Sequence, residues 1–247
     1  MLCVFRYLPY AYFMNTQEHL RRQYLAAMGI PLWEPRAAVA STEADSPVVS
    51  SPAPIPVTEP THVIPAEWAT LEQAVRTCTK CALHTTRTQT VFGVGSRSAQ
   101  WMFIGEAPGA DEDRQGEPFV GRAGQLLNAM LFAIGLKREE VYIANILKCR
   151  PPGNRDPQPD EVEQCEPYLV QQIQLIQPRL IVALGRHATH SLLKTDLPLS
   201  KLRGQRHSYH GTPLIVTYHP AYLLRTPTDK RKVWDDLCLA KTIVVSP

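Results

Sequence analysis

An apolar run that ends in a glycine turn most limits how this chain can fold. Trp101 to Ile104 is apolar throughout, which is typical of a buried strand. Gly105-Glu106-Ala107-Pro108-Gly109 follows directly, and its small residues and proline predict a sharp turn. Ligands of open α/β sheets bind beyond the carboxyl ends of the strands. Residues 101–127 therefore predict a ligand pocket, with an ordinary strand-to-helix loop as the alternative.

Apolar runs and helical patterns continue to alternate along the chain. Further strands are predicted at 141–147, 179–184 and 213–218. Helices are predicted at 67–77, 125–134, 159–176, up to Leu193, and over 228–239. Strands that alternate with helices form a mainly parallel sheet covered on both faces. The predicted fold class is therefore α/β.

The chain before residue 66 differs in composition from the rest. Residues 37–65 are rich in Pro, Ser, Ala and Val, and no Lys or Arg occurs between Arg36 and Arg76. Such a stretch buries too little apolar surface to offset the cost of ordering it, so we expect a disordered linker. Residues 1–36 are expected to form an N-terminal docking peptide or helix, and the folded domain is expected at 66–247.

The first 36 residues contain two further features. Residues 1–13 are apolar, but a bilayer span needs roughly 20 apolar residues, and Met14 is an alternative start. Residues 28–36, MGIPLWEPR, follow Arg21-Arg22 and are similar to the N-terminal peptide of the psi subunit of bacterial DNA polymerase III. That resemblance implies docking on a clamp loader, or on another replication protein, through residues 14–36.

Overall composition narrows the class of protein only partly. The hydrophobic content of 44% is that of a globular protein, and a formal charge of +3 does not by itself imply a nucleic-acid partner. Six irregularly spaced cysteines favour metal or thiol chemistry in a reducing, cytoplasmic compartment over a disulfide framework.

Four of the cysteines form a set with ligand-like spacing: Cys78, Cys81, Cys149 and Cys165. The first two make a CxxC pair, the third lies in a Pro/Gly-rich loop, and the fourth lies early in the next helix. Four thiolates suit either a tetrahedral zinc ion or a [4Fe–4S] cluster, and the spacing does not separate these two. Buried cysteines that act as small hydrophobic residues are the alternative.

Several motifs occur together in a fixed order along residues 66–243. They are GEAPG at 105–109, GEPFVGRAG at 116–124, Asn145, KCRPPGNR at 148–155 and HPAYLLR at 219–225. This arrangement resembles the family 4 uracil-DNA glycosylases, which are iron–sulfur enzymes of DNA repair. The resemblance implies an α/β/α sandwich, a [4Fe–4S] cluster on the four cysteines, and hydrolytic removal of uracil from DNA.

The resemblance also assigns roles in a base pocket. An enzyme that acts on a base in a duplex must first flip the base out. The Asn145 carboxamide carries a donor and an acceptor, so it can bond uracil N3–H and O4 together. Phe119 is the stacking face, and His219 donates to uracil O2 as an oxyanion hole would. The backbone of Gly105, Glu106 and Ala107 lines the same pocket; a capped turn or a core aromatic is the plainer explanation for each residue alone.

A water molecule must attack the sugar, and the sequence offers several acids near the turn. Glu106 is the first candidate for holding the water and Glu112 is the second, while Asp111 and Asp113 are expected to be solvated loop acids. The tyrosine that other superfamily members use to exclude thymine is lacking, so discrimination against thymine is not assigned to that device.

A basic stretch between Lys201 and Lys232 predicts contacts to DNA phosphates. The predicted DNA-binding residues are Lys201, Arg203, Arg206, Leu223, Leu224 and Arg225, with the two leucines and Arg225 as a wedge that fills the space left by the flipped base. A solvated basic face is the alternative.

Two other functions remain open for the whole protein. One is an inactive iron–sulfur DNA-binding accessory protein, and the other is an α/β hydrolase of unrelated function that is stabilised by zinc.

Overall fold

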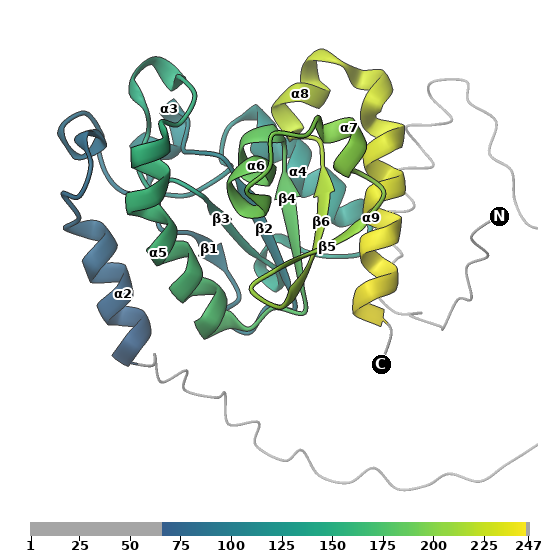
Figure 1. Cartoon of the computed structure of the whole chain (residues 1–247), viewed down its shortest axis with the longest axis horizontal. Coiled ribbons are helices and arrows are strands. Elements are labelled where there is room, and N and C mark those ends of the chain that lie inside the picture. The colour runs from purple at the N-terminus through teal and green to yellow at the C-terminus, as the bar shows by residue number, and fades with distance from the viewer. Residues whose placement is uncertain (1–65, 246–247) are drawn as a thin grey trace, which may run out of the picture. The chain divides into compact units, whose positions relative to one another are not determined.

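The structure is a computed structural model, and it describes residues 66–245 (Figure 1). The predicted docking peptide at residues 1–36 and the predicted linker at 37–65 lie outside the described residues. In the described part of the chain, no helix is long and apolar enough to cross a membrane.

A six-stranded sheet forms the centre of the described domain. Its strands are β1 (Val94–Gly95), β2 (Trp101–Gly105), β3 (Tyr142–Asn145), β4 (Leu180–Leu184), β5 (Arg206–Tyr209) and β6 (Thr212–Thr217). The spatial order is β1-β3-β2-β4-β6-β5, with β3, β2, β4 and β6 parallel and the two edge strands antiparallel. The prediction of a mainly parallel sheet is confirmed.

Helices cover both faces of this sheet, as the alternating side chains of β2 show. Met102 and Ile104 pack in a core with α2 (Ala66–Arg76), α5 (Pro159–Ile176), α6 (Arg186–Leu193) and α7 (Leu199–Leu202). Trp101 and Phe103 pack in a second core with α4 (Arg122–Ala133), α8 (Pro220–Arg225) and α9 (Lys230–Val245). In Figure 1, α2 and α5 lie to the left of the sheet and α9 lies to its right. The α/β/α sandwich is confirmed.

Short elements connect these layers. They are α3 (Ala110–Gln115) and the 3-10 helices η1 (Ala82–Thr85), η2 (Arg138–Glu140), η3 (Pro152–Asn154) and η4 (Pro227–Asp229). Helix α4 begins at Arg122, three residues before the predicted start, because Gly121 supplies its extended N-cap. Helix α9 runs to Val245, beyond the predicted end at Leu239, because Ala240 and Val244 continue its buried face.

Main-chain bonds continue past the carboxyl ends of the parallel strands and hold their loops together. The Ile146 N–H donates to the Gly105 carbonyl at 3.0 Å, and the Leu147 N–H donates to the Glu106 carbonyl at 3.1 Å. The Gly185 N–H donates to the Thr217 carbonyl at 2.8 Å. The loops after β2, β3, β4 and β6 are therefore fixed side by side, which is where a ligand site forms in such a sheet.

Candidate active site

An open cleft of about 860 Å³ lies at this carboxyl edge. Every one of the four loops contributes to its lining, including the turn after β2, the last residue of β3, and Tyr218 and His219 after β6. Its lining includes the predicted site residues Glu106, Ala107, Glu112, Phe119, Asn145 and His219 and the predicted DNA-binding residue Arg225, but not Gly105. Residues far apart in the sequence are thus brought to one surface.

Asn145, the last residue of β3, offers an unused acceptor to the cleft. The residue is only 2% exposed, and its Oδ1 atom has no hydrogen-bond partner among the described residues. A buried acceptor without a partner costs about 1–3 kcal/mol, so native structures rarely keep one without a reason. A ligand N–H that fills this position would remove that cost.

Phe119 forms the wall next to Asn145. Its backbone has φ of 55°, a left-handed conformation that is uncommon for an aromatic residue, and its side chain is buried. The ring stacks on His219 with a centroid distance of 5.5 Å and an interplanar angle of 29°. A Cβ atom on Gly105 would overlap both the Phe119 ring and the Asn145 Oδ1 atom, and one on Gly124 would overlap the Phe119 carbonyl. The glycines of both motifs are therefore required by close packing.

His219 is held as a neutral donor. It is the N-cap of α8, and its Nδ1 atom accepts a hydrogen bond from the Ala221 N–H at 3.1 Å. A backbone N–H only donates, so Nδ1 carries the lone pair and the ring proton of the neutral form lies on Nε2. Burial, with help from the Arg225 charge, lowers the pKa of His219 to about 4. The side chain therefore presents an Nε2–H donor at neutral pH.

Glu112 stabilises the loops around the pocket. Its carboxylate accepts from the N–H groups of Gly109 at 3.1 Å, Val120 at 3.0 Å and Gly121 at 3.1 Å. One oxygen thus caps α3, while the other holds the segment that follows Phe119. These bonds favour a positioning role for Glu112 over its predicted role as a second candidate for holding water.

The other acids of this segment differ from one another. The prediction that Asp113 is a solvated loop acid is wrong: it is 3% exposed and accepts from the Thr88 N–H at 3.0 Å. This bond ties α3 to the segment that follows the CxxC pair, a long-range contact without a local sequence signal. Asp111 forms a surface ion pair with Arg114.

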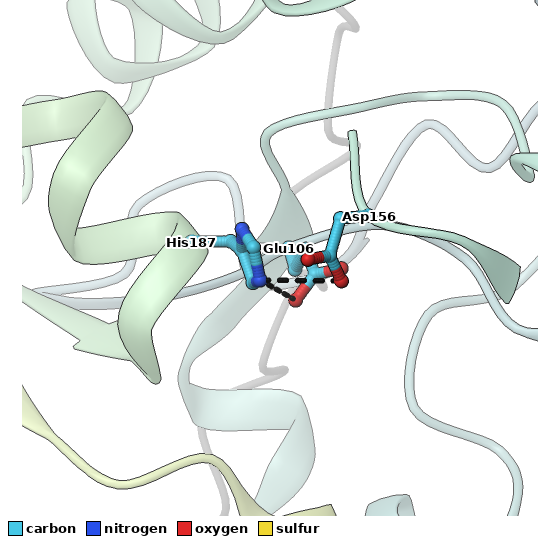
Figure 2. A group of neighbouring side chains, drawn as sticks. All are labelled: Glu106, Asp156 and His187. Atoms are coloured by element: carbon cyan, nitrogen blue, oxygen red, sulfur yellow. Dashed lines mark ion pairs between the residues drawn. The ribbon is translucent and has the colours of Figure 1, made fainter. Parts of the chain in front are cut away.

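Glu106 lies in a cluster with Asp156 and His187, as Figure 2 shows. The Nε2 atom of His187 is 3.3 Å from Asp156 Oδ1 and 4.0 Å from Glu106 Oε2. Burial, and then the charge of Asp156, raises the pKa of Glu106 to about 7, while burial lowers the pKa of His187. Glu106 therefore changes protonation near neutral pH. Sequence reasoning missed Asp156 and His187, because only the tertiary fold brings their loops beside the GEAPG turn.

The four predicted cysteines line one small cavity between α2, α5 and the loop after β3. Arg87 donates to the Cys149 sulfur at 3.1 Å, and the Lys148 N–H donates to the Cys165 sulfur at 3.2 Å. Burial raises the thiol pKa of Cys81, Cys149 and Cys165, so these residues are poorly suited to remain as unliganded thiolates. Their convergence with donors aimed at sulfur fits a metal-bound thiolate set.

The distances between the sulfur atoms bear on the choice between the two candidate metals. Among the described residues, only Glu106, Asp156 and His187 bring three potential ligand atoms within 4.8 Å of one another, so no three of the four sulfurs do. A tetrahedral zinc ion with Zn–S bonds of about 2.3 Å requires sulfurs about 3.8 Å apart. As they lie in the structure, the four sulfur atoms are therefore farther apart than the ligands of a single zinc ion.

The predicted DNA-binding residues differ in their exposure. Lys201, Arg206 and Arg225 are exposed. Arg203 is only 12% exposed in its side chain and donates to the buried Asp236 carboxylate at 2.7 Å, so its guanidinium is already engaged within the domain. Leu223 packs in the core, whereas Leu224 is 38% exposed. Of the predicted wedge, Leu224 and Arg225 are thus exposed and Leu223 is not, and Arg203 is poorly placed for the predicted phosphate contact.

Comparison with known proteins places the chain in a family. The model of the uracil DNA glycosylase superfamily matches residues 92–238. A type-4 uracil-DNA glycosylase of Archaeoglobus fulgidus is 50% identical over 161 residues, which cover 62% of this chain and 81% of that protein. The type-4 enzyme of Thermotoga maritima is 42% identical over 178 residues, which cover 70% and 93%. With the predicted motifs in place, this chain belongs to the type-4 family of the uracil DNA glycosylase superfamily.

Proposed function

We propose that this protein is a DNA-repair enzyme that flips uracil out of DNA and hydrolyses its N-glycosidic bond, leaving an abasic site. The main observation behind this proposal is the buried Asn145 Oδ1 atom, which has no hydrogen-bond partner within residues 66–245 and lies next to the Phe119 ring and the His219 donor. A planar ligand with an N–H group and two carbonyl oxygens matches this set, and uracil is such a ligand. The named type-4 relatives support the same activity.

Base recognition in this proposal uses two side chains and the backbone of the turn after β2. Asn145 accepts from uracil N3–H through Oδ1 and donates to O4 through its amide nitrogen. Phe119 stacks on the uracil ring, and its left-handed backbone is held by Glu112 through the following N–H groups. The backbone of Glu106 and Ala107 lines the pocket, and no side chain fits at the preceding Gly105.

Bond cleavage places negative charge on uracil O2 and positive charge on the sugar. The Nε2–H of His219 donates to O2 and stabilises the departing uracil anion, as an oxyanion-hole donor does. A neutral donor needs no proton uptake before this step, which agrees with the low pKa of His219. Glu106 orients the attacking water, and its ionised form also stabilises the positive sugar.

We infer that Cys78, Cys81, Cys149 and Cys165 hold a [4Fe–4S] cluster. The support is the shared cavity and the two donors to sulfur, together with a sulfur arrangement too open for a single zinc ion among the described residues. When bound, the cluster supplies a rigid cross-link rather than a reacting group. DNA phosphates are assigned to Lys201, Arg206 and Arg225, and Leu224 fills the space left by the flipped base.

The N-terminal docking function rests on sequence alone. Residues 14–36 are proposed to bind a clamp-loader subunit or another replication protein, with Trp33 as the anchor. A pull-down with a peptide of residues 14–40 tests this. Enrichment of clamp-loader subunits over a Trp33→Ala peptide is expected, and equal recovery with both peptides would exclude the role.

A uracil-release assay without magnesium tests the main proposal. The purified protein is expected to produce alkali-labile abasic sites in single- or double-stranded oligonucleotides that contain uracil, and none in matched thymine controls. Asn145→Ala should remove most of this activity while salt-dependent DNA binding stays intact. Binding without cleavage by the iron-loaded wild-type protein would instead identify the inactive accessory protein.

A further inference from the structure

A buried lysine connects the base pocket with the four-cysteine site. Lys148 is 1% exposed and lies between Asn145 and Cys149 in the loop that follows β3. No carboxylate in the described part of the chain forms an ion pair with it, whereas buried lysines are normally paired. The base chemistry proposed above gives this residue no role.

The contacts of Lys148 extend in two directions. Its backbone N–H donates to the Cys165 sulfur at 3.2 Å, and its side chain lines the cavity of the four cysteines. Its Nζ atom donates to the backbone carbonyl of Asn145 at 2.9 Å and to Gln172 Oε1 at 2.7 Å. One residue thus contacts both a cysteine sulfur and the residue that reads the base.

Gln172 fixes the ammonium group from the opposite side. It is fully buried, and its Nε2 atom donates to the Phe92 carbonyl at 2.9 Å and to the Tyr142 hydroxyl at 3.1 Å. Both acceptors of Lys148 Nζ are therefore held by the sheet and by α5. The network is satisfied in hydrogen bonds, but all of its acceptors are neutral.

A buried ammonium group with neutral acceptors still lacks a counter-charge, and burial of an uncompensated charge is costly. The nearest source of negative charge is the thiolate set of Cys149 and Cys165, which line the same cavity as Lys148. Four thiolates bound to a cluster leave net negative charge in a site with low dielectric constant. The lysine and the liganded cysteines therefore stabilise each other.

We propose that Lys148 is a positioning residue that holds the Asn145 backbone for uracil recognition and supplies the internal counter-charge of the thiolate site. This inference rests on the proposed function, because it assumes a cluster on the cysteines and uracil in the cleft. Loss of the ammonium group removes the charge-assisted bond to the Asn145 carbonyl, so the carboxamide loses its alignment. The same loss weakens retention of the metal.

Lys148→Met tests both effects, because it keeps an unbranched side chain and removes the charge. The readouts are iron and sulfide per chain, and direct calorimetric binding of free uracil, which needs no turnover. We expect reduced iron and uracil binding weaker by about tenfold or more, as for loss of a charged hydrogen bond. Lys148→Gln keeps a donor for the Asn145 carbonyl without the charge, so it should lose iron similarly but bind uracil better than Lys148→Met.

Lys80→Met is the matched control. Lys80 lines the same cavity and lies over the Tyr168 ring at 4.9 Å, but it is exposed and has no contact with Asn145. It should leave uracil affinity unchanged. Wild-type iron content and wild-type uracil affinity in Lys148→Met would overturn the proposal. If Lys148→Met does not fold, Lys148→Gln is judged by the same readouts, and wild-type values there overturn it equally. Failure of the wild-type protein to bind iron or uracil would instead refute the proposed function.

Discussion

At the scale of single residues, the pocket shifts the pKa values of two titratable groups in opposite directions. Burial lowers the pKa of His219 to about 4, whereas burial and Asp156 raise the pKa of Glu106 to about 7. His219 therefore stays neutral over the whole range in which Glu106 changes charge. Opposite shifts of this kind suit the proposed roles, in which His219 is a neutral donor and Glu106 orients water.

The pH dependence of the reaction follows from these shifts. The pKa of Glu106 is about 7, so the ionised form that we propose to orient water is lost as the pH falls through about 7. Single-turnover rates are expected to rise between about pH 6 and pH 8 and then level off. Glu106→Gln should give a slow rate without this rise. Asp156→Asn removes a like charge and should move the midpoint to lower pH; an unchanged midpoint would show that another group titrates.

A second prediction at this scale concerns Gly105. Gly105→Ala places a methyl group against the Asn145 Oδ1 atom and the Phe119 ring, so uracil binding should weaken by roughly 100-fold, with a stability loss of about 1–3 kcal/mol. Gly211→Ala is the control: its φ of 84° makes alanine strained, but the space around it is open. It should lower stability without reducing uracil affinity, as calorimetry and urea unfolding would show.

Sequence reasoning predicted one pocket for Asn145, Phe119 and His219 from motifs near the ends of strands, and the structure brings the three residues to one cleft. Sequence reasoning did not identify Asp156 or His187, which approach Glu106 only after β3 and β4 are paired with β2. The burial of Leu223 and the Arg203–Asp236 pair were equally inaccessible, since both depend on how α8 and α9 pack. Residue type and spacing therefore predicted which motif residues line the cleft better than they predicted the charged groups around it.

At the scale of elements, long apolar patterns predicted the structure and short polar ones did not. The four parallel strands and the long helices were expected, but β1, β5, α3, α7 and α8 were not. Strand β5 has the sequence RHSY, and only Tyr209 is buried, so it lacks the signal of a strand. It forms because the His210-Gly211 turn, with positive φ at both residues, folds it onto β6.

Glu112 shows how a short helix shapes the pocket. Its carboxylate accepts three backbone N–H groups from two separate loops. Glu112→Gln replaces one acceptor oxygen by an amide, so one N–H loses its partner and stability should fall by about 1–3 kcal/mol. Uracil affinity should fall with it, because the Phe119 loop is released. Glu139→Gln, at an exposed acid of η2, is the control; equal urea midpoints for the two variants would contradict the positioning role.

At the scale of the whole domain, the four-cysteine site brings together parts of the chain that are far apart in the sequence. Cys78 and Cys81 follow α2, Cys149 follows β3, and Cys165 lies in α5. The segment from α2 to β1 also contacts the rest of the domain through Arg87, Thr88 and the buried face of α2. A cross-link here joins parts of the chain that are about 70 residues apart, and closing such a loop stabilises the folded state considerably.

Removal of the cross-link should therefore loosen one part of the domain first. In Cys165→Ser we expect less iron, a lower unfolding temperature, and faster amide exchange in α2 and η1, while β2 and β4 stay protected because the sheet retains its own core. Cys238→Ser, at a cysteine of α9 outside the set, should keep wild-type iron and exchange. Uniform loss of protection across α2 and the central strands would contradict this prediction. It would mean that the cysteine site and the sheet unfold as one cooperative unit.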